Sequence, residues 1–222
     1  MAKLASCFAP MAKEATLAIG YAHPYLGACV AEQALTINCM PAPHGALYWP
    51  SGKPSCTVLA HESELPFGDV RFNRVLLVHA VEHTEHLRGL MKEVWRVLTP
   101  GGRVLVVVPN RLSFWARSSQ SPFGYGRPFT RSQVKDLLEE TQFTYLRAQA
   151  VLFMPPVDFK WVRKIAGMFE YIGRMFFPMF GGVWVVEAEK QIYATIKEPV
   201  AKRTYAPTPV GVPQTIRSLN RL

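Results

Sequence analysis

The chain has 222 residues, of which 49% are hydrophobic and 18% charged, and its formal net charge is +9. This length suits one domain with an appended segment, and the composition excludes a wholly disordered chain or a coiled coil. The four cysteines are widely spaced and form no C-x-x-C pair, which argues against a zinc site or a small disulfide framework. The uncharged run 175–186 is only 12 residues long, too short for a spanning helix, and the N-terminus lacks the features of a secretory signal peptide. We therefore expect a soluble, cytoplasmic protein.

The positive charge is concentrated in one part of the chain. Between Val94 and Lys135 there are seven basic residues and no Asp or Glu. A field of this kind attracts anions, whether an anionic small molecule, a nucleic acid or an anionic membrane surface. A solvated face that only keeps the protein soluble would account for the charge equally well.

Short apolar runs alternate with amphipathic stretches along the chain. Strands are predicted at 15–20, 34–39, 56–60, 74–81, 103–108, 145–154 and 183–193, and helices at 85–98, 130–141 and 159–177. Within 85–98, apolar side chains recur at intervals of three and four residues, and the sequence TPGG that follows is expected to end the helix in a sharp turn. Thr130 is predicted to cap the next helix.

The strand–helix–strand unit at 74–108 predicts a right-handed βαβ crossover in a parallel sheet. We therefore expect a single-domain α/β protein, Rossmann-like, with a mostly parallel central sheet and helices on both faces. Antiparallel pairing at one sheet edge is left open. The domain is predicted to cover 1–195, followed by a basic, proline-rich and disordered tail at 196–222. The segment 161–180 mixes basic and aromatic residues, as interfacial helices do, although packing in the core is the more usual explanation.

The region from Ser63 to Asn110 contains, in order, LPF, a short apolar strand, EH, an amphipathic helix, RVLTPGG and a second apolar strand. In this order and spacing, the region resembles the central half of class I S-adenosylmethionine-dependent methyltransferases of the small-molecule type. The resemblance implies the Rossmann-like fold, S-adenosylmethionine as the cofactor, and ligands bound beyond the carboxyl ends of the strands.

The resemblance assigns cofactor contacts to the residues that follow the first three strands. Gly20, Tyr21 and Ala22 take the place of the family's glycine-rich turn, although Pro24 replaces its last glycine and Ala18 replaces its acidic residue. Asn38 corresponds to the carboxylate that holds the ribose. His61 takes the position that contacts the adenine, with Glu62 next to it, and a surface loop accounts for this segment equally well.

The segment after the fourth strand contains His79, Glu82 and His83. By the resemblance, it lines the floor between cofactor and substrate. His79 and His83 are candidates for the general base, His79 also for a cofactor contact, and Glu82 for orienting the substrate. No metal is expected, because two histidines four residues apart need one helical face and His79 is predicted to lie in a strand.

The long basic and aromatic loop after the fifth strand carries Arg111, Arg117 and Arg127. Loops of this kind often close over the substrate, and these arginines would then bind an anionic group. Alternatively, the aromatic residues of the loop pack under the sheet edge.

The sequence thus predicts a methyltransferase that transfers a methyl group to an anionic small molecule by direct displacement. The alternative is a non-catalytic binding or scaffold protein that keeps the fold and has lost the pocket, since Ala18, Pro24 and Asn38 depart from the family pattern. Membrane-surface or nucleic-acid contact through the basic regions is compatible with either interpretation.

Overall fold

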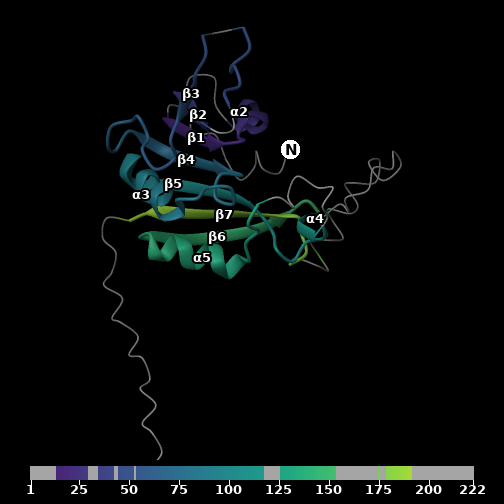
Figure 1. Ribbon diagram of the computed structural model, residues 1–222. Coiled ribbons are helices and arrows are strands. Elements are labelled where there is room, and N and C mark those ends of the chain that lie inside the picture. The colour runs from purple at the N-terminus through teal and green to yellow at the C-terminus, as the bar shows by residue number, and fades with distance from the viewer. Residues whose placement is uncertain are drawn as a thin grey trace, which may run out of the picture.

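In a computed structural model, the protein is described at residues 14–29, 35–42, 45–52, 54–117, 126–153, 175 and 179–191. Seven strands form one sheet in the order β3-β2-β1-β4-β5-β7-β6, with β3 and β6 at its two edges (Figure 1). The strands are β1 (Thr16–Gly20), β2 (Thr36–Pro41), β3 (Thr57–Ala60), β4 (Phe72–Val78), β5 (Leu98–Pro109), β6 (Phe143–Val151) and β7 (Val183–Lys190). The first five are parallel, and β7 is antiparallel to both β5 and β6.

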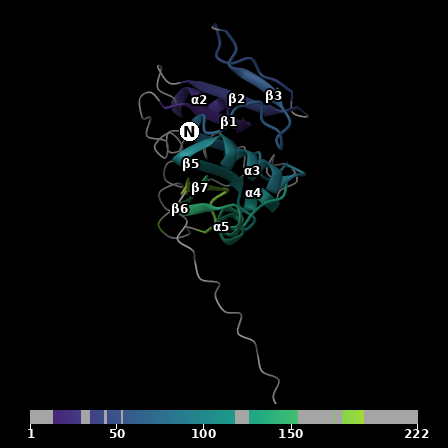
Figure 2. The ribbon, with the colours of Figure 1, turned by 90° about the vertical axis from the view of Figure 1, so that its left-hand side faces the viewer.

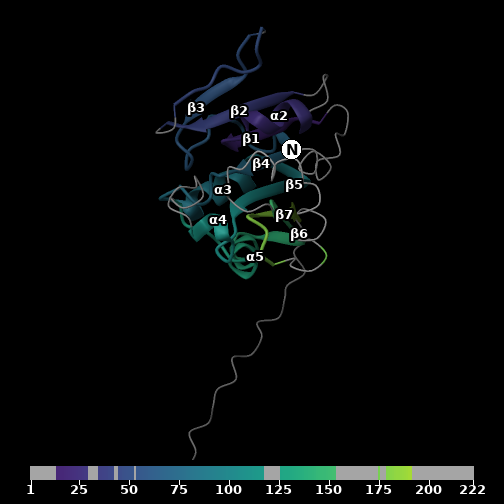
Figure 3. The ribbon, with the colours of Figure 1, turned by 90° about the vertical axis from the view of Figure 1, so that its right-hand side faces the viewer.

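Helices cover both faces of the sheet. They are α2 (His23–Cys29), α3 (Leu87–Val97), α4 (Phe114–Arg117) and α5 (Arg131–Glu140). The two side views place α3 and α5 on one face and α2 on the other (Figures 2 and 3). This arrangement is the predicted Rossmann-like α/β architecture, with the antiparallel pairing confined to the edge that β7 and β6 form.

Two buried clusters correspond to the two faces. On one, side chains of the strands pack against Leu90, Met91 and Val94 of α3 and Val134 and Leu138 of α5. On the other, a smaller cluster of alternate strand residues packs against Leu26 of α2. The parallel strands are covered on both faces, so their sequences are continuous apolar runs and not alternations of apolar and polar residues.

The predicted turn after α3 takes a different form in the structure. The helix ends at Val97, and β5 begins at once with Leu98, so that the TPGG residues lie inside the assigned strand. Leu98 pairs with Phe72, whereas the next pair is Arg103 with Arg74, so the intervening residues form an irregularity in the ladder. Gly101 takes a φ of 69° there, which is the left-handed geometry expected at the end of a helix.

The cap of α5 is confirmed. The Thr130 hydroxyl accepts a hydrogen bond from the Gln133 N–H, and the Gln133 side chain accepts one from the Thr130 N–H, which completes a capping box. The predicted helix at 159–177 and tail at 196–222 fall outside the described residues, apart from Met175. Within the described part of the chain, no helix is long and apolar enough to cross a membrane.

Two polar clusters fix α3 to the rest of the domain. Arg96 donates to the carbonyls of Leu65 and Phe67 and forms ion pairs with Glu93 and Asp69. These contacts hold the loop before β4 against the helix. The hydrogen bond from Arg96 is the main reason why the pKa of Glu93 lies below its ordinary value.

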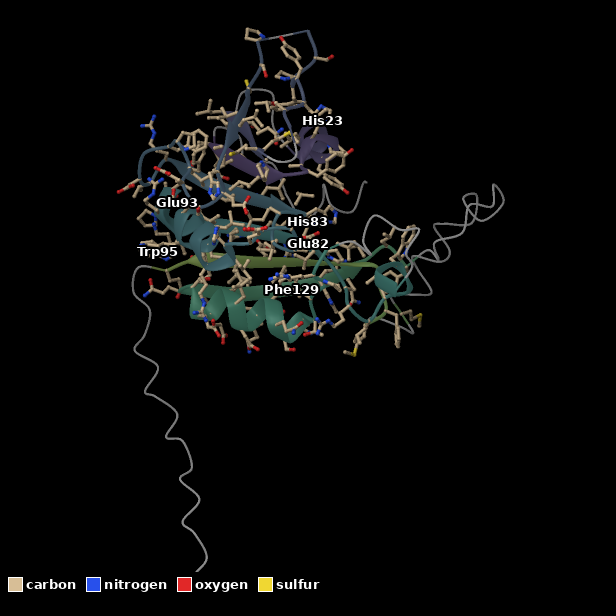
Figure 4. All side chains as sticks on the ribbon, viewed as in Figure 1. His23, Glu82, His83, Glu93, Trp95 and Phe129 are labelled. Atoms are coloured by element: carbon tan, nitrogen blue, oxygen red, sulfur yellow. The ribbon has the colours of Figure 1, made fainter. Side chains whose placement is uncertain are left out.

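At the C-terminus of α3, buried Lys190 of β7 donates to the Trp95 and Leu98 carbonyls at 2.7 and 2.6 Å. Its Nζ also lies 3.9 Å from the centre of the Trp95 ring. A cation is favourable at this end of a helix, where carbonyl groups lack partners. Glu93 and Trp95 lie at one end of the molecule, well away from Glu82 and His83 (Figure 4), so these clusters serve the fold and not the site described next.

Candidate active site at the carboxyl ends of the parallel strands

The first component of the site is the turn after β1. Gly20 has a φ of 89°, and a Cβ atom at this position would lie 2.3 Å from the Val78 carbonyl oxygen and 3.0 Å from the Ala80 Cβ. The same carbonyl accepts a hydrogen bond from the Tyr21 N–H at 2.8 Å. Only glycine fits this position, both because of the left-handed φ and because β4 is so close. Ala22 is buried and packs into the core, whereas Tyr21 is exposed.

Asn38 does not lie where the sequence interpretation required. It pairs with Ala18 and Thr57 in the middle of β2, is completely buried, and its amide has no hydrogen-bond partner among the described residues. The strand ends three residues later at Pro41, followed by Ala42. The error came from placing the end of β2 too early: the run of buried residues continues through Cys39 and Met40.

A pocket of about 290 Å³ opens at the ends of β2, β3 and β4. Its volume is close to the lower end of the range for small-molecule sites. Three of the predicted residues, His61, Glu62 and His83, line it. The full lining is Pro41, Ala42, His61, Glu62, Ala80, His83, Thr84, Glu85 and His86.

The polar wall of the pocket comes from the segments after β3 and β4. Thr84 is buried, and its hydroxyl donates a hydrogen bond to Glu62. This bond ties the loop after β3 to the turn after β4. His61 is exposed, and its Nδ1 lies 2.7 Å from the Ser63 hydroxyl. The pocket therefore presents a carboxylate and imidazole rings, groups that can bind the amino and hydroxyl groups of a nucleoside.

His79 is the first residue after β4 and does not lie within the strand, in contrast to the prediction. Its φ is 53°, a left-handed value that costs a residue with a side chain about 1–2 kcal/mol. Its Nδ1 lies 2.6 Å from Oε1 of Glu82, whose side chain is only 1% exposed. Backbone strain of this kind is often retained at functional sites, where the surrounding structure holds it in place.

The segment that returns from the loop after β5 covers this pair. The Arg127 N–H donates to the Glu82 carbonyl at 3.1 Å, and a Cβ atom on Gly126 would lie 2.8 Å from Cγ of Glu82 and 3.2 Å from Cε1 of His83. Phe129 lies close to Glu82 and His83 in the middle of the molecule (Figure 4). The Arg111 N–H donates to the Phe129 carbonyl, which joins the start of this loop to its end.

The three arginines of this loop are described to different extents. Arg111 and Arg127 are exposed, and neither is among the residues that line the pocket, whereas the side chain of Arg117, the last residue of α4, is outside the described residues. The sequence interpretation placed the segment that contains Ala80 and Thr84 at the floor of the site but singled out neither residue, and it missed Gly126. The position of Thr84 and Ala80 directly after β4 was the available signal for them, but nothing in the sequence indicates that Gly126 packs on Glu82.

Metal binding has no support within the described ranges, where no group of three or more His, Cys, Asp and Glu side chains has a suitable arrangement. The groups that converge at the strand ends are a glycine turn, a carboxylate–hydroxyl pair and a carboxylate–imidazole pair. Their place beyond the carboxyl ends of the parallel strands, at the point where β1 and β4 are neighbours, is where ligands bind in doubly wound α/β sheets.

The comparisons with known proteins agree with this arrangement. Residues 25–106 match the family described as "Methyltransferase domain". A SAM-dependent methyltransferase from Thermotoga maritima, described as a possible histamine N-methyltransferase, is 17% identical with a TM-score of 0.61, over 85% of this chain and 86% of that one. A SAM-dependent methyltransferase from Archaeoglobus fulgidus is 20% identical with a TM-score of 0.56, over 80% and 86%.

A curated relative, an uncharacterised protein of Methanocaldococcus jannaschii, is 26% identical over 102 residues, which are 43% of this chain and 50% of that protein. The chain thus spans about half the length of this relative. The fold is that of the two methyltransferase structures named above. Part of the chain is therefore similar to a methyltransferase domain, and its fold is shared with SAM-dependent methyltransferases of known structure.

Proposed function

We propose that the protein binds S-adenosylmethionine in the pocket at the ends of β2, β3 and β4 and methylates a small molecule that carries an anionic group. The observation that carries this proposal is the position of the pocket next to the Gly20 turn, at the switch point of a 3-2-1-4-5-7-6 sheet. The cofactor would supply a methyl group on a sulfonium sulfur, which is open to attack by a nucleophile.

The residues of the pocket fit the cofactor in part. Gly20 lets the turn after β1 pack directly on β4 beside Ala80, which lines the pocket, so the turn supports the pocket wall from behind. Glu62 supplies a carboxylate in the pocket, held by Thr84, that can accept hydrogen bonds from the adenine amino group or the ribose hydroxyls. By contrast, Pro41 and Ala42 at the end of β2 offer no carboxylate for the ribose.

The chain's own residues provide the groups that would handle a proton from the acceptor. Imidazole accepts protons near neutral pH, and the turn after β4 presents two of them. His83 lines the pocket, and His79 is held by the buried carboxylate of Glu82. Methyl transfer needs no covalent enzyme intermediate, so alignment of the acceptor is the main task of these groups.

We assign the anionic part of the acceptor to Arg111 and Arg127. Both are exposed, and the hydrogen bond from the Arg127 N–H to the Glu82 carbonyl holds Arg127 beside the turn after β4. A guanidinium pairs well with carboxylate or phosphate groups.

Titration calorimetry with S-adenosylmethionine and S-adenosylhomocysteine tests the proposal. We expect micromolar binding of at least one of them to the wild type, a loss of at least tenfold in Gly20→Ala, and no change in Gly101→Ala, which is remote from the pocket. Absence of binding at millimolar ligand would contradict the proposal and favour a non-catalytic binding protein.

A further inference from the structure

Glu82 is a buried carboxylate of which only one oxygen is used. Oε1 pairs with Nδ1 of His79 at 2.6 Å, whereas Oε2 has no hydrogen-bond partner among the described residues and is inaccessible to solvent. A buried polar group without a partner costs free energy, and the cost is greater for a charged one. Such a group in a native structure requires an explanation, and a ligand that supplies the missing donor is one.

Glu82 lies beside the pocket without lining it. Its neighbours Ala80, His83 and Thr84 line the pocket itself. Its own side chain packs under Gly126, and its carbonyl accepts a hydrogen bond from the Arg127 N–H, so it lies between the turn after β4 and the loop that follows β5. That loop is the one expected to cover the substrate.

We propose that Glu82 recognises the methyl acceptor and that its Oε2 binds a positively charged amino group of that molecule. This inference rests on the proposed function and specifies its substrate class. The acceptor is then a zwitterion: its amino group lies at Glu82, and its anionic group at Arg111 and Arg127.

The charge of Glu82 favours an amine over other donors. An ammonium group both donates a hydrogen bond to Oε2 and compensates the buried negative charge, whereas a neutral hydroxyl does only the first. A carboxylate or phosphate group brought to the same place would be repelled and would leave Oε2 without a donor. The exposed arginines are therefore the place for the anionic group, and Glu82 is the place for the cationic one.

Glu82 also holds His79 in position, but this role does not explain why Oε2 is buried without a partner among the described residues. Oε1 alone accounts for the contact with His79, and the burial of Oε2 adds a cost that positioning does not require. A buried charge without its partner costs free energy. A site in which the ligand supplies that partner therefore discriminates strongly against ligands that lack the pairing group.

The test measures binding to the protein saturated with S-adenosylhomocysteine, so that no turnover is needed. Calorimetry and thermal shift are run with matched pairs that differ only in an amino or a hydroxyl group: glycine and glycolate, β-alanine and 3-hydroxypropanoate, and 4-aminobutanoate and 4-hydroxybutanoate. We expect at least one amine to bind the wild type ten times more tightly than its hydroxyl partner. Glu82→Gln should remove this preference and keep the affinity for S-adenosylhomocysteine.

Glu140→Gln is the matched control, because it removes one carboxylate charge from an exposed side chain on α5. It should keep the preference for the amine. Should Glu82→Gln fail to fold, Gly126→Ala serves instead, since its Cβ would displace the Glu82 side chain without removing the charge. It should lower the affinity for the amine by at least fivefold.

The outcomes separate the two proposals. Failure of the wild type to bind S-adenosylhomocysteine would count against the proposed function itself. Binding of S-adenosylhomocysteine without any preference for an amine, or with a preference that persists in Glu82→Gln, would overturn the role of Glu82 and leave the methyltransferase proposal intact.

Discussion

Replacement of Gly20 by alanine should damage both the stability of the domain and its ligand binding. The new Cβ would lie 2.3 Å from the Val78 carbonyl oxygen, whereas ordinary contacts begin at 3.4 Å, so the two atoms would have to separate by about 1.1 Å. That carbonyl accepts the Tyr21 N–H, and the movement would disturb the hydrogen bond between the turn and β4. The left-handed φ adds strain for any residue with a Cβ.

The size of the effect follows from these two parts. The left-handed conformation costs about 1–2 kcal/mol and the steric overlap about 1–3 kcal/mol. We therefore expect Gly20→Ala to lower the free energy of unfolding by about 2–5 kcal/mol. Gly101→Ala is the matched control, because Gly101 has a φ of 69° and no atom within 4 Å of the added Cβ. It should cost only about 1–2 kcal/mol.

Denaturant unfolding of the two variants, followed by circular dichroism, measures the difference, and calorimetry with S-adenosylhomocysteine measures the effect on the site. Equal stability of Gly20→Ala and Gly101→Ala would refute the steric argument. Wild-type affinity in a folded Gly20→Ala variant would show that the tight turn is not part of the cofactor site.

Three further predictions concern stability. The pKa of Glu93 is lowered from 4.5 mainly by its hydrogen bond with Arg96, so the stability it contributes is present above pH 4.5 and is lost as the pH falls through its pKa in the folded state. Denaturant unfolding between about pH 5 and about pH 3 should therefore show a steeper loss for the wild type than for Glu93→Gln, and parallel curves would contradict this. His79→Gly should be more stable than His79→Ala by about 1 kcal/mol, because glycine accepts the left-handed φ. The reverse order in denaturant unfolding would remove the argument for strain. Lys190→Met should lower the free energy of unfolding by about 1–3 kcal/mol, because two carbonyls at the end of α3 lose their donor. An unchanged thermal midpoint would mean that water replaces the lysine.

The sequence predicted the fold well where one local pattern decides the structure. Helix α3 follows from apolar residues at intervals of three and four, α5 from the predicted cap Thr130, and β4 and β5 from apolar runs. The ends of the elements were less accurate. The buried run of β2 continues past Asn38 through Met40, and only the register with β3 decides where the strand stops.

The site was harder to predict, because its decisive contacts join distant segments. Glu62 and Thr84 are in contact although they are 22 residues apart in the sequence. Gly126 packs on Glu82 although all of β5 lies between them in the sequence. The candidates His61, Glu62 and His83 line one pocket because the segments that carry them follow parallel strands, while their roles remain predictions. Nothing in the sequence indicated that Glu82 would be buried with one oxygen unpaired, since burial of a charged side chain depends on the loop that covers it.

The place of β7 in the sheet has a consequence for the synthesis of the protein. Val183–Lys190 is the last strand among the described residues, yet it lies between β5 and β6, so β6 has no neighbour in the described sheet until β7 is added. Its terminal lysine also supplies the donor at the end of α3. A nascent chain on the ribosome must therefore hold two open strand edges, on β5 and β6, until residue 190 has left the exit tunnel, and exposed edges of this kind promote aggregation. Loss of the chain beyond residue 182 would leave both edges permanently open.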